Sequence, residues 1–492
     1  MKSRWYKWPA YIIFILCAVY SVLLIPGPEP PAPAESGKKP FAWNLDTYWS
    51  ILENAFKQAT AAGCESITPR IADHFDHIDN LMTNLESDTL SPGEPLLAEI
   101  ENSFFELSVF EAACPDRLND YIDTFSRLRR LVKKQSINWD INSRPARDRI
   151  YRLLYGGRTA VEEVMMQAPL DTLPSTIIGV DEPSATPEAE ILGVKIHSGD
   201  ILVSRGGAPT SALIARGNDY PGNFSHAALV HIDSIDHKIS IIESHIEMGV
   251  AVADLDDYLR DTKLRVMVLR LRADLPCMID DPMLPHRAAE YALRRAHEEH
   301  IPYDFAMDTD DPSKLFCSEV VSDAYRRVGV RLWSALSHIS SPGVKDWLAA
   351  FGVRHFTTQE PSDLEYDPQL RVVAEWRDHE TLYKDRLDNA VVDIMLEKAD
   401  RGVRLEYDRY MLPAARIMKV YSVFLNQFGG VGPVPKGMDA VAALKNEWFS
   451  NRHSEIKEKL IALAERFEHD KGYSPPYWEL IKLARQAYET LY

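Results

Sequence analysis

The residue with the clearest chemical potential in this sequence is a cysteine, Cys317, at the head of an amphipathic stretch. Apolar residues follow it at steps of one, three and four, the spacing of one helix face: Val320, Val321, Ala324 and Val328. We expect Asp311-Pro312-Ser313 to supply the break and cap before that helix. A thiol at a helix N-terminus meets unpaired N–H groups and the positive end of the helix dipole, which favour the nucleophilic thiolate. The stretch alone leaves open that Cys317 is a small buried side chain, as most free cysteines are.

A histidine and a glutamate on two neighbouring strand candidates form the second feature. Residues 225–232 and 239–244 alternate like strands, and Asp233-Ser-Ile-Asp236 between them has turn chemistry. A four-residue loop would place Ile232 opposite His237, and therefore His226 opposite Glu243. Facing side chains in such a ladder stand about 5 Å apart at Cβ. The sequence thus predicts an imidazole beside a carboxylate on one face of a hairpin.

These three side chains match the needs of a cysteine nucleophile. His226 would take the proton of Cys317, and Glu243 would orient the imidazole and stabilise its charged form. The backbone N–H of Ser318 would face a developing oxyanion. The assembly requires the Cys317 helix to pack on the sheet face that carries His226. The alternative is that His226 is a core histidine with Glu243 as its hydrogen-bond partner.

The remaining pattern divides the chain into regions. A helical region spans 43–167, with helical periodicity in each of its segments. Short strands and the cysteine helix share 190–375, which favours an α+β domain with an antiparallel sheet. Helical periodicity returns over 377–492.

The motifs of the middle region resemble those of the circularly permuted papain-like hydrolases, the YiiX-like branch of the NlpC superfamily. In chain order they are Gly199-Asp200, Ser225-His226-Ala-Ala-Leu, Glu243-Ser244, Tyr303-Asp304-Phe305, Phe316-Cys317-Ser318-Glu319-Val320-Val321 and Pro361-Ser-Asp-Leu364. As in that family, the histidine strand precedes the cysteine helix. The family usually has alanine after the glutamate where this chain has Ser244, which leaves the carboxylate in place.

The resemblance covers roughly residues 190–375 and implies a permuted papain-like fold. It implies Cys317 as nucleophile, His226 as base and Glu243 as the third polar residue, with Tyr303 lining the site by analogy. It leaves both flanking helical regions unexplained.

The N-terminus has the features of a targeting segment. Lys2, Arg4 and Lys7 precede an apolar run from Ala10 to Ile25, and a proline-rich linker fills 26–42. Basic residues before an apolar run predict a signal anchor or signal peptide over 1–25, with the body exported across the cell membrane. We expect an uncleaved, single-pass anchor and an extracytoplasmic body.

Charge and cysteine content limit the partners. The formal net charge of −18 argues against nucleic acid as a partner. Five cysteines are too few for a disulfide scaffold, but an exported body permits disulfides, so Cys64 and Cys114 either pair or stay separate buried thiols. The crowded histidines His226, His231, His237 and His245 have no recognisable metal-ligand spacing, and we expect no metal and no cofactor.

The sequence therefore predicts a membrane-anchored, exported cysteine hydrolase that cleaves an amide through a thioester. Cell-wall peptide or a similar amide is the expected substrate. Two alternatives remain open: a lipid acyl hydrolase or acyltransferase with the same three residues, and an inert membrane-tethered scaffold.

Overall fold

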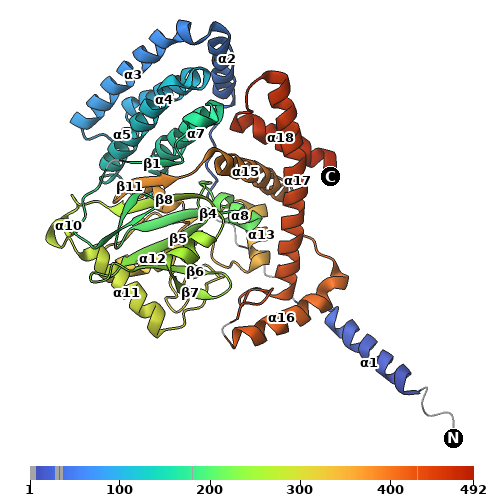
Figure 1. Ribbon diagram of the computed structural model, residues 1–492. Coiled ribbons are helices and arrows are strands. Elements are labelled where there is room, and N and C mark those ends of the chain that lie inside the picture. The colour runs from blue at the N-terminus through green and yellow to red at the C-terminus, as the bar shows by residue number, and fades with distance from the viewer. Residues whose placement is uncertain (1–6, 28–32, 34–36, 180, 429) are drawn as a thin grey trace.

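The protein is built around an antiparallel sheet with helices packed on several sides (Figure 1). The computed structural model describes residues 7–27, 33, 37–179, 181–428 and 430–492. Helices precede the sheet in the chain and helices follow it, as the periodicity predicts. The predicted α+β class with helical flanks is confirmed.

The first helical region buries its apolar faces in one large core. A disulfide joins Cys64, at the start of α3, to Cys114, directly after α4, so the structure has the pairing rather than two separate thiols. The Cα atoms of the pair are 5.4 Å apart. The elements of this region are α2 (Asp46–Ala62), α3 (Cys64–Ser87), α4 (Pro95–Ala113), η1 (Pro115–Arg117), α5 (Leu118–Ser136), α6 (Arg144–Tyr151), the π-helical turn η2 (Arg152–Gly156), α7 (Gly157–Gln167) and η3 (Leu170–Thr172).

Seven strands form the main sheet, and every neighbouring pair is antiparallel. In spatial order they are β1 (Thr176–Ile178), β11 (Leu370–Trp376), β8 (Lys263–Leu271), β4 (Ile201–Gly206), β5 (His226–Ile232), β6 (Ile239–His245) and β7 (Gly249–Ala253). Two small strand pairs accompany the sheet: β2 (Glu188–Ile191) with β3 (Val194–His197), and β9 (Ser337–His338) with β10 (Thr357–Thr358).

The two faces of the sheet bury separate cores. Ala227 and Leu229 of β5 lie in a core covered by α10 (Pro276–Asp280), α11 (Leu284–Glu298) and α12 (Cys317–Arg327). Ala228 and Val230 lie in a second core with the β2–β3 pair and the segment around α9 (Leu255–Arg260). Because successive strand residues point to opposite faces, β5 contributes to both cores.

The hairpin of β5 and β6 differs by two residues from the predicted register. Ile232 pairs with Ile239 rather than His237, so Glu243 faces Ala228 and not His226. The loop is longer than predicted because the Asp233 carboxylate accepts backbone N–H bonds at 2.7 and 3.2 Å from the two residues Ile235 and Asp236, building a wider turn. A shift of two keeps every side chain on its face, whereas a shift of one would reverse them.

The last helical region packs beside the sheet and the first helices. Its elements are α15 (His379–Asp400), η4 (Arg409–Met411), α16 (Leu412–Asn426), α17 (Ala440–Lys471) and α18 (Tyr477–Leu491). The middle region also contains α8 (Pro209–Arg216), α13 (Pro342–Phe351) and α14 (Asp363–Tyr366).

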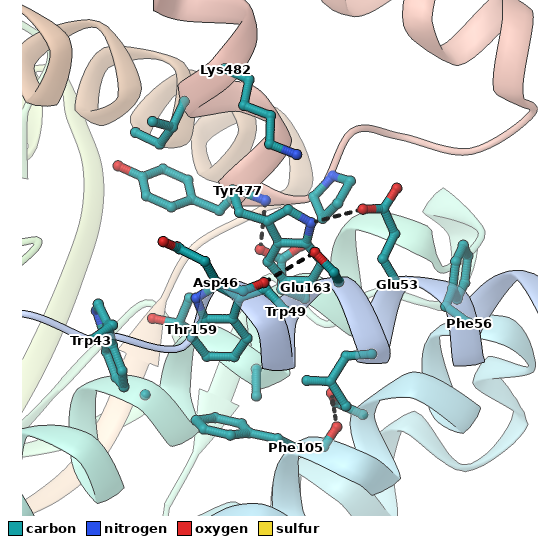
Figure 2. A pocket seen from close by; sticks show the side chains of 18 of the residues that line it. Trp43, Asp46, Trp49, Glu53, Phe56, Phe105, Thr159, Glu163, Tyr477 and Lys482 are labelled. Carbon is teal, nitrogen blue, oxygen red and sulfur yellow. Dashed lines mark hydrogen bonds between the residues drawn. The ribbon is translucent and has the colours of Figure 1, made fainter.

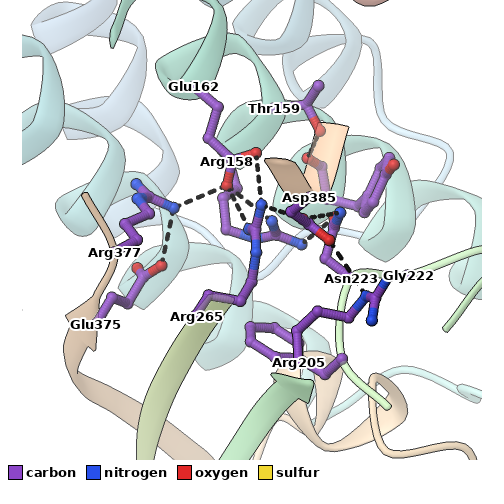
Figure 3. Close-up of polar contacts among 12 residues, drawn as sticks. Arg158, Thr159, Glu162, Arg205, Gly222, Asn223, Arg265, Glu375, Arg377 and Asp385 are labelled. Carbon is purple, nitrogen blue, oxygen red and sulfur yellow. Dashed lines mark hydrogen bonds and ion pairs between the residues drawn. The ribbon is translucent and has the colours of Figure 1, made fainter. Parts of the chain in front are cut away.

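Buried ion pairs connect all three parts of the chain (Figure 3). The Arg158 guanidinium of α7 donates to both carboxylate oxygens of Glu365, at 2.7 and 3.0 Å. Arg265 of β8 donates to Glu162 of α7 at 2.7 Å and to Asp385 of α15. Since these side chains are buried, removing one partner would leave an uncompensated charge in the interior.

The apolar N-terminal segment forms α1 (Lys7–Leu23), which projects from the body beside α16 (Figure 1). In the described part of the chain, no helix is both long and apolar enough to cross a membrane. Lys2, Arg4 and part of the proline-rich linker, residues 28–32 and 34–36, lie outside the described residues.

Candidate active site

The cysteine stands at the first residue of its helix, as predicted. Cys317 begins α12, and Val320, Val321 and Ala324 are buried on one side of that helix. The predicted cap at Asp311-Pro312-Ser313 is wrong, because the helix starts four residues after Ser313. Glu319 caps it instead: an oxygen of its carboxyl group accepts the Phe316 N–H at 3.1 Å.

The imidazole and the carboxylate are in contact despite the shifted register. His226 Nε2 lies 2.7 Å from Glu243 Oε2. The two residues are diagonal neighbours on one face of the β5–β6 pair, a separation that long side chains span. Glu243 engages Nε2, which leaves Nδ1 as the ring nitrogen that faces other partners.

The thiol reaches this pair from the end of the strand. Cys317 Sγ is 3.9 Å from the carbonyl oxygen of Ser225, the residue before β5, and the interaction of Cys317 with the His226 side chain raises the pKa of that imidazole. The assumption that α12 packs on the face carrying His226 is wrong. The apolar side of α12 packs against Ala227 and Leu229, on the opposite face, and only the start of the helix passes the edge where His226 lies.

The charges in this cluster are coupled. Burial opposes a charge on His226, but hydrogen bonds with Cys317 and Glu243 outweigh it and raise the pKa of the imidazole to about 10. Burial likewise opposes a charge on Glu243, yet the bonds to His226 and His245 lower the pKa of this carboxyl well below its usual range. At neutral pH the pair is therefore imidazolium and carboxylate.

A second histidine joins the cluster and was not among the predicted site residues. His245 Nε2 lies 3.0 Å from Glu243 Oε1, and its ring stacks on that of His226 with centroids 5.7 Å apart. The signal was its position two residues after Glu243 on one strand, which places both on the same face. His245 gives the carboxylate a second partner and so fixes its orientation.

Ser318 and Tyr303 lie next to Cys317, in different roles. The Ser318 hydroxyl donates to the Gln359 carbonyl at 2.7 Å, so the group it offers to the site is its backbone N–H in the first helical turn. Burial and the adjacent Cys317 raise the pKa of Tyr303 well above its usual value, which keeps the phenol neutral.

Glu360 is a further acid near the thiol that sequence reasoning missed. It is buried, and burial together with Asp363 and Cys317 raises the pKa of its carboxyl well above the usual range. Its signal was its place directly before the Pro361-Ser-Asp-Leu364 motif. A neutral carboxyl in this position can donate a hydrogen bond.

A cavity of about 400 Å³ adjoins the cluster on the Tyr303 side. It is lined from β7, from the segment before α12 and from the loop after α16, including Gly249, Tyr303, Lys314 and Lys436. A larger cavity of about 650 Å³ lies between the first and last helical regions, among aromatic side chains such as Trp49 (Figure 2). None of Cys317, His226 and Glu243 lines either of these two cavities, but Tyr303, the neighbour of Cys317, lines the smaller one.

One group of described residues offers a metal-like arrangement. His231, His286 and Glu290 place their ligand atoms within 4.8 Å of one another. They lie on the α11 side of β5, away from His226. The second such group contains Cys64 and Cys114, whose sulfur atoms are already joined.

Comparison with known proteins finds a family for the middle region of the chain. Residues 195–374 match the model of a family described as permuted papain-like amidase enzyme, YaeF/YiiX, C92 family. Among solved structures, the chain is similar to the metalloprotein YiiX from Escherichia coli O157:H7 (DUF1105), with 18% identity and a TM-score of 0.29 over 36% of this chain and 95% of that chain. None of the curated proteins matches. The predicted family resemblance is confirmed for residues 195–374.

Proposed function

We propose that residues 195–374, as a permuted papain-like amidase domain, cleave an amide bond through a thioester on Cys317. The observation that carries the proposal is that one imidazole interacts with both partners: His226 Nε2 lies 2.7 Å from Glu243 Oε2, and Cys317 and Glu243 both raise the pKa of His226. This is the nucleophile, base and orienter of a cysteine hydrolase.

The residues divide the reaction between them. The imidazolium of His226 favours thiolate at Cys317, and the sulfur attacks the amide carbonyl carbon. The oxyanion that forms faces the N–H groups at the start of α12, including that of Ser318. His226 gives its proton to the leaving nitrogen, the C–N bond breaks, and a thioester remains.

Water completes the cycle. Neutral His226 takes a proton from water, the hydroxide oxygen attacks the thioester carbon, and the C–S bond breaks to release a carboxylic acid and the thiolate. Glu243 keeps its negative charge throughout and holds the ring in one orientation. Tyr303, neutral and beside the sulfur, lines the pocket for the acyl part.

Replacing the sulfur tests the assignment directly. Cys317→Ala should abolish amide hydrolysis, while circular dichroism and the thermal transition stay those of the unchanged protein. Turnover that survives in a folded Cys317→Ala protein would reject Cys317 as nucleophile.

The proposed location is a membrane-anchored, extracytoplasmic body. Lys7, the first residue of the apolar α1, supports an N-terminal anchor with this orientation. The Cys64–Cys114 disulfide supports an oxidising compartment. A C-terminal alkaline phosphatase fusion should be active, and the protein should fractionate with membranes; an inactive fusion of normal abundance would refute export.

The proposed substrate class is a peptide amide of cell-wall type, as an amidase family and an exported body suggest. A lipid acyl ester is the second candidate, because the cavity beside Tyr303 borders the loop that follows the apolar helix α16. Incubation with muropeptides and with labelled phospholipids separates the two. Acyl release from lipid without muropeptide cleavage would favour the lipid ester as substrate. If Cys317 reacts with neither substrate and is not alkylated, the result would favour an inert scaffold.

A further inference from the structure

The helix α16 is packed with its apolar side outward. The helix buries only a few of its described side chains. These are Leu412 and Pro413 at its start and the small residues Ala415 and Ser422. Its large apolar side chains are between 41% and 70% exposed, with α1 in place: Ile417, Met418, Val420, Tyr421, Val423 and Phe424. A helix on a water-exposed surface shows the reverse distribution, and the fold leaves this apolar face of α16 uncovered.

A second apolar element lies at the same place, although it is almost 400 residues away in the sequence. Arg416 of α16 donates to the carbonyls of Leu23 at 2.9 Å and Ile25 at 2.8 Å, at the end of α1. The Tyr20 hydroxyl donates to the Tyr410 carbonyl at 3.0 Å. The side chains of α1 are themselves exposed, among them Ile13, Phe14, Leu16 and Val22. Figure 1 shows α1 extending away from the body, with its end beside the start of α16. Both helices therefore leave apolar side chains exposed where α1 ends and α16 begins.

The charge of this segment is opposite to that of the protein. Residues 409–438 contain four basic residues, Arg409, Arg416, Lys419 and Lys436, and no aspartate or glutamate, whereas the whole chain has a net charge of −18. Within the described residues, none of the four forms an ion pair with a carboxylate. Arg416 and Lys419 bond to backbone carbonyls instead. The segment therefore presents positive charge beside apolar side chains, which is the composition of helices that lie on anionic membranes.

We propose that α16 lies in the interface of an anionic lipid bilayer, with α1 as its neighbour in the same membrane. The apolar residues of α16 enter the acyl boundary, and the basic residues meet the phosphate groups. The body is then held by two contacts rather than by a single flexible anchor.

This placement bears on the substrate. Lys436 and Gly437, in the loop that follows α16, line the cavity beside Tyr303. If the proposed amidase function holds, the site takes substrates attached to the membrane or close to its surface. Binding of α16 to lipid does not depend on that function.

A fluorescent label on α16 of the full chain tests the proposal separately from insertion of α1. NBD is attached at Val420→Cys, with the three free cysteines replaced and the disulfide retained, and the protein is added to phosphatidylcholine vesicles with and without phosphatidylglycerol. The matched control is Ile279→Cys on α10, whose native side chain is 68% exposed. We expect a blue shift and quenching by acyl-brominated lipid at position 420 only, strongest with the anionic lipid.

Polar substitutions give the reciprocal test. The triple variant Ile417→Ser, Val420→Ser and Phe424→Ser should lower vesicle partitioning about tenfold or more, because it removes three of the six large apolar side chains that α16 places in the bilayer. The control triple variant places serine at three scattered exposed apolar residues, Leu192, Ile235 and Ile279, and should partition like the unchanged protein.

Three results would overturn the proposal. They are an aqueous, unquenched label at position 420 on vesicles that bind the protein, equal partitioning of the two triple variants, or a label at position 420 that is already buried without lipid in a dimer seen by light scattering. If one of these results is found while Cys317 reacts normally in lipid-free buffer, the proposal that α16 binds the membrane is refuted and the proposed amidase function is not affected.

Discussion

Alkylation of Cys317 as a function of pH tests the central contact of the candidate site without knowledge of the substrate. A thiol with the ordinary pKa of about 8.5 is about 0.3% thiolate at pH 6 and half thiolate at pH 8.5, so its rate rises about 150-fold over this range. Beside Cys317, His226 keeps its proton across the whole interval, because its pKa is raised to about 10. A thiolate paired with that imidazolium should react at a rate that changes by less than about threefold.

The assay follows iodoacetamide modification of each cysteine peptide by mass spectrometry at several pH values. For each cysteine, the rate at one pH is divided by the rate of the same residue at another pH. This ratio is used because Cys317 is only 5% exposed, and restricted access lowers its rates at every pH alike. Cys277 in the same molecule and the variant His226→Gln are the comparisons. A Cys317 profile that rises as steeply as that of a simple thiol, or that is unchanged in folded His226→Gln, would refute the thiolate–imidazolium pair.

Three further outcomes follow from the charges of the buried groups. Glu243→Gln removes the carboxylate that helps raise the pKa of His226 to about 10, so the alkaline limb of kcat/KM should move down by about 1 to 3 pH units. Burial raises the pKa of Glu319 to about 9. Between about pH 4.5 and 9 the folded state therefore holds one more proton than the unfolded state. The free energy of unfolding falls by at most about 1.4 kcal/mol per pH unit as the pH rises through this range. Glu319→Gln should remove that slope in denaturant unfolding at pH 6, 7 and 8. Arg158→Met leaves the Glu365 carboxylate buried without its bidentate partner and should cost about 3 to 5 kcal/mol of unfolding free energy.

Each of these has its own control and its own contrary result. The glutamine at 319 can still accept the Phe316 N–H and cap the helix, so a large loss of stability at pH 6 would contradict a neutral Glu319. For Arg158, the comparison is Arg117→Met, which breaks a surface pair with Asp120 and should cost less than about 1 kcal/mol. Equal costs for the two would argue against the buried network as a source of stability. An alkaline limb unmoved by Glu243→Gln would separate the carboxylate from the imidazole.

Much of the candidate site was predictable because it depends on short-range order. The helix that begins at Cys317 follows from apolar spacing over a dozen residues. The shared face of His226 and Glu243 follows from alternation along two adjacent strands, and it survived a two-residue error in register because only an odd shift changes the face. The order of motifs along the chain was sufficient to indicate the family that matches residues 195–374.

Other parts of the site depend on long-range packing, which no local pattern encodes. Alternation along β5 does not say which face α12 covers, and the prediction chose the wrong one. The acid at Glu360 is set beside Cys317 by the fold of a loop more than forty residues later in the chain. The wider turn at Asp233 arises from side-chain hydrogen bonds that compete with a four-residue loop.

The amino-acid sequence by itself determined which residues are candidates for the chemistry, which elements carry them and that the first segment of the chain is apolar, because each of these depends on residues close together in the chain. Only the tertiary structure decided that sulfur, imidazole and carboxylate meet at the end of a strand. It also decided that α16 turns its apolar side outward next to α1. Such juxtapositions are set by the sum of many burial and ion-pair energies across the molecule, and that sum exists only once the chain is folded.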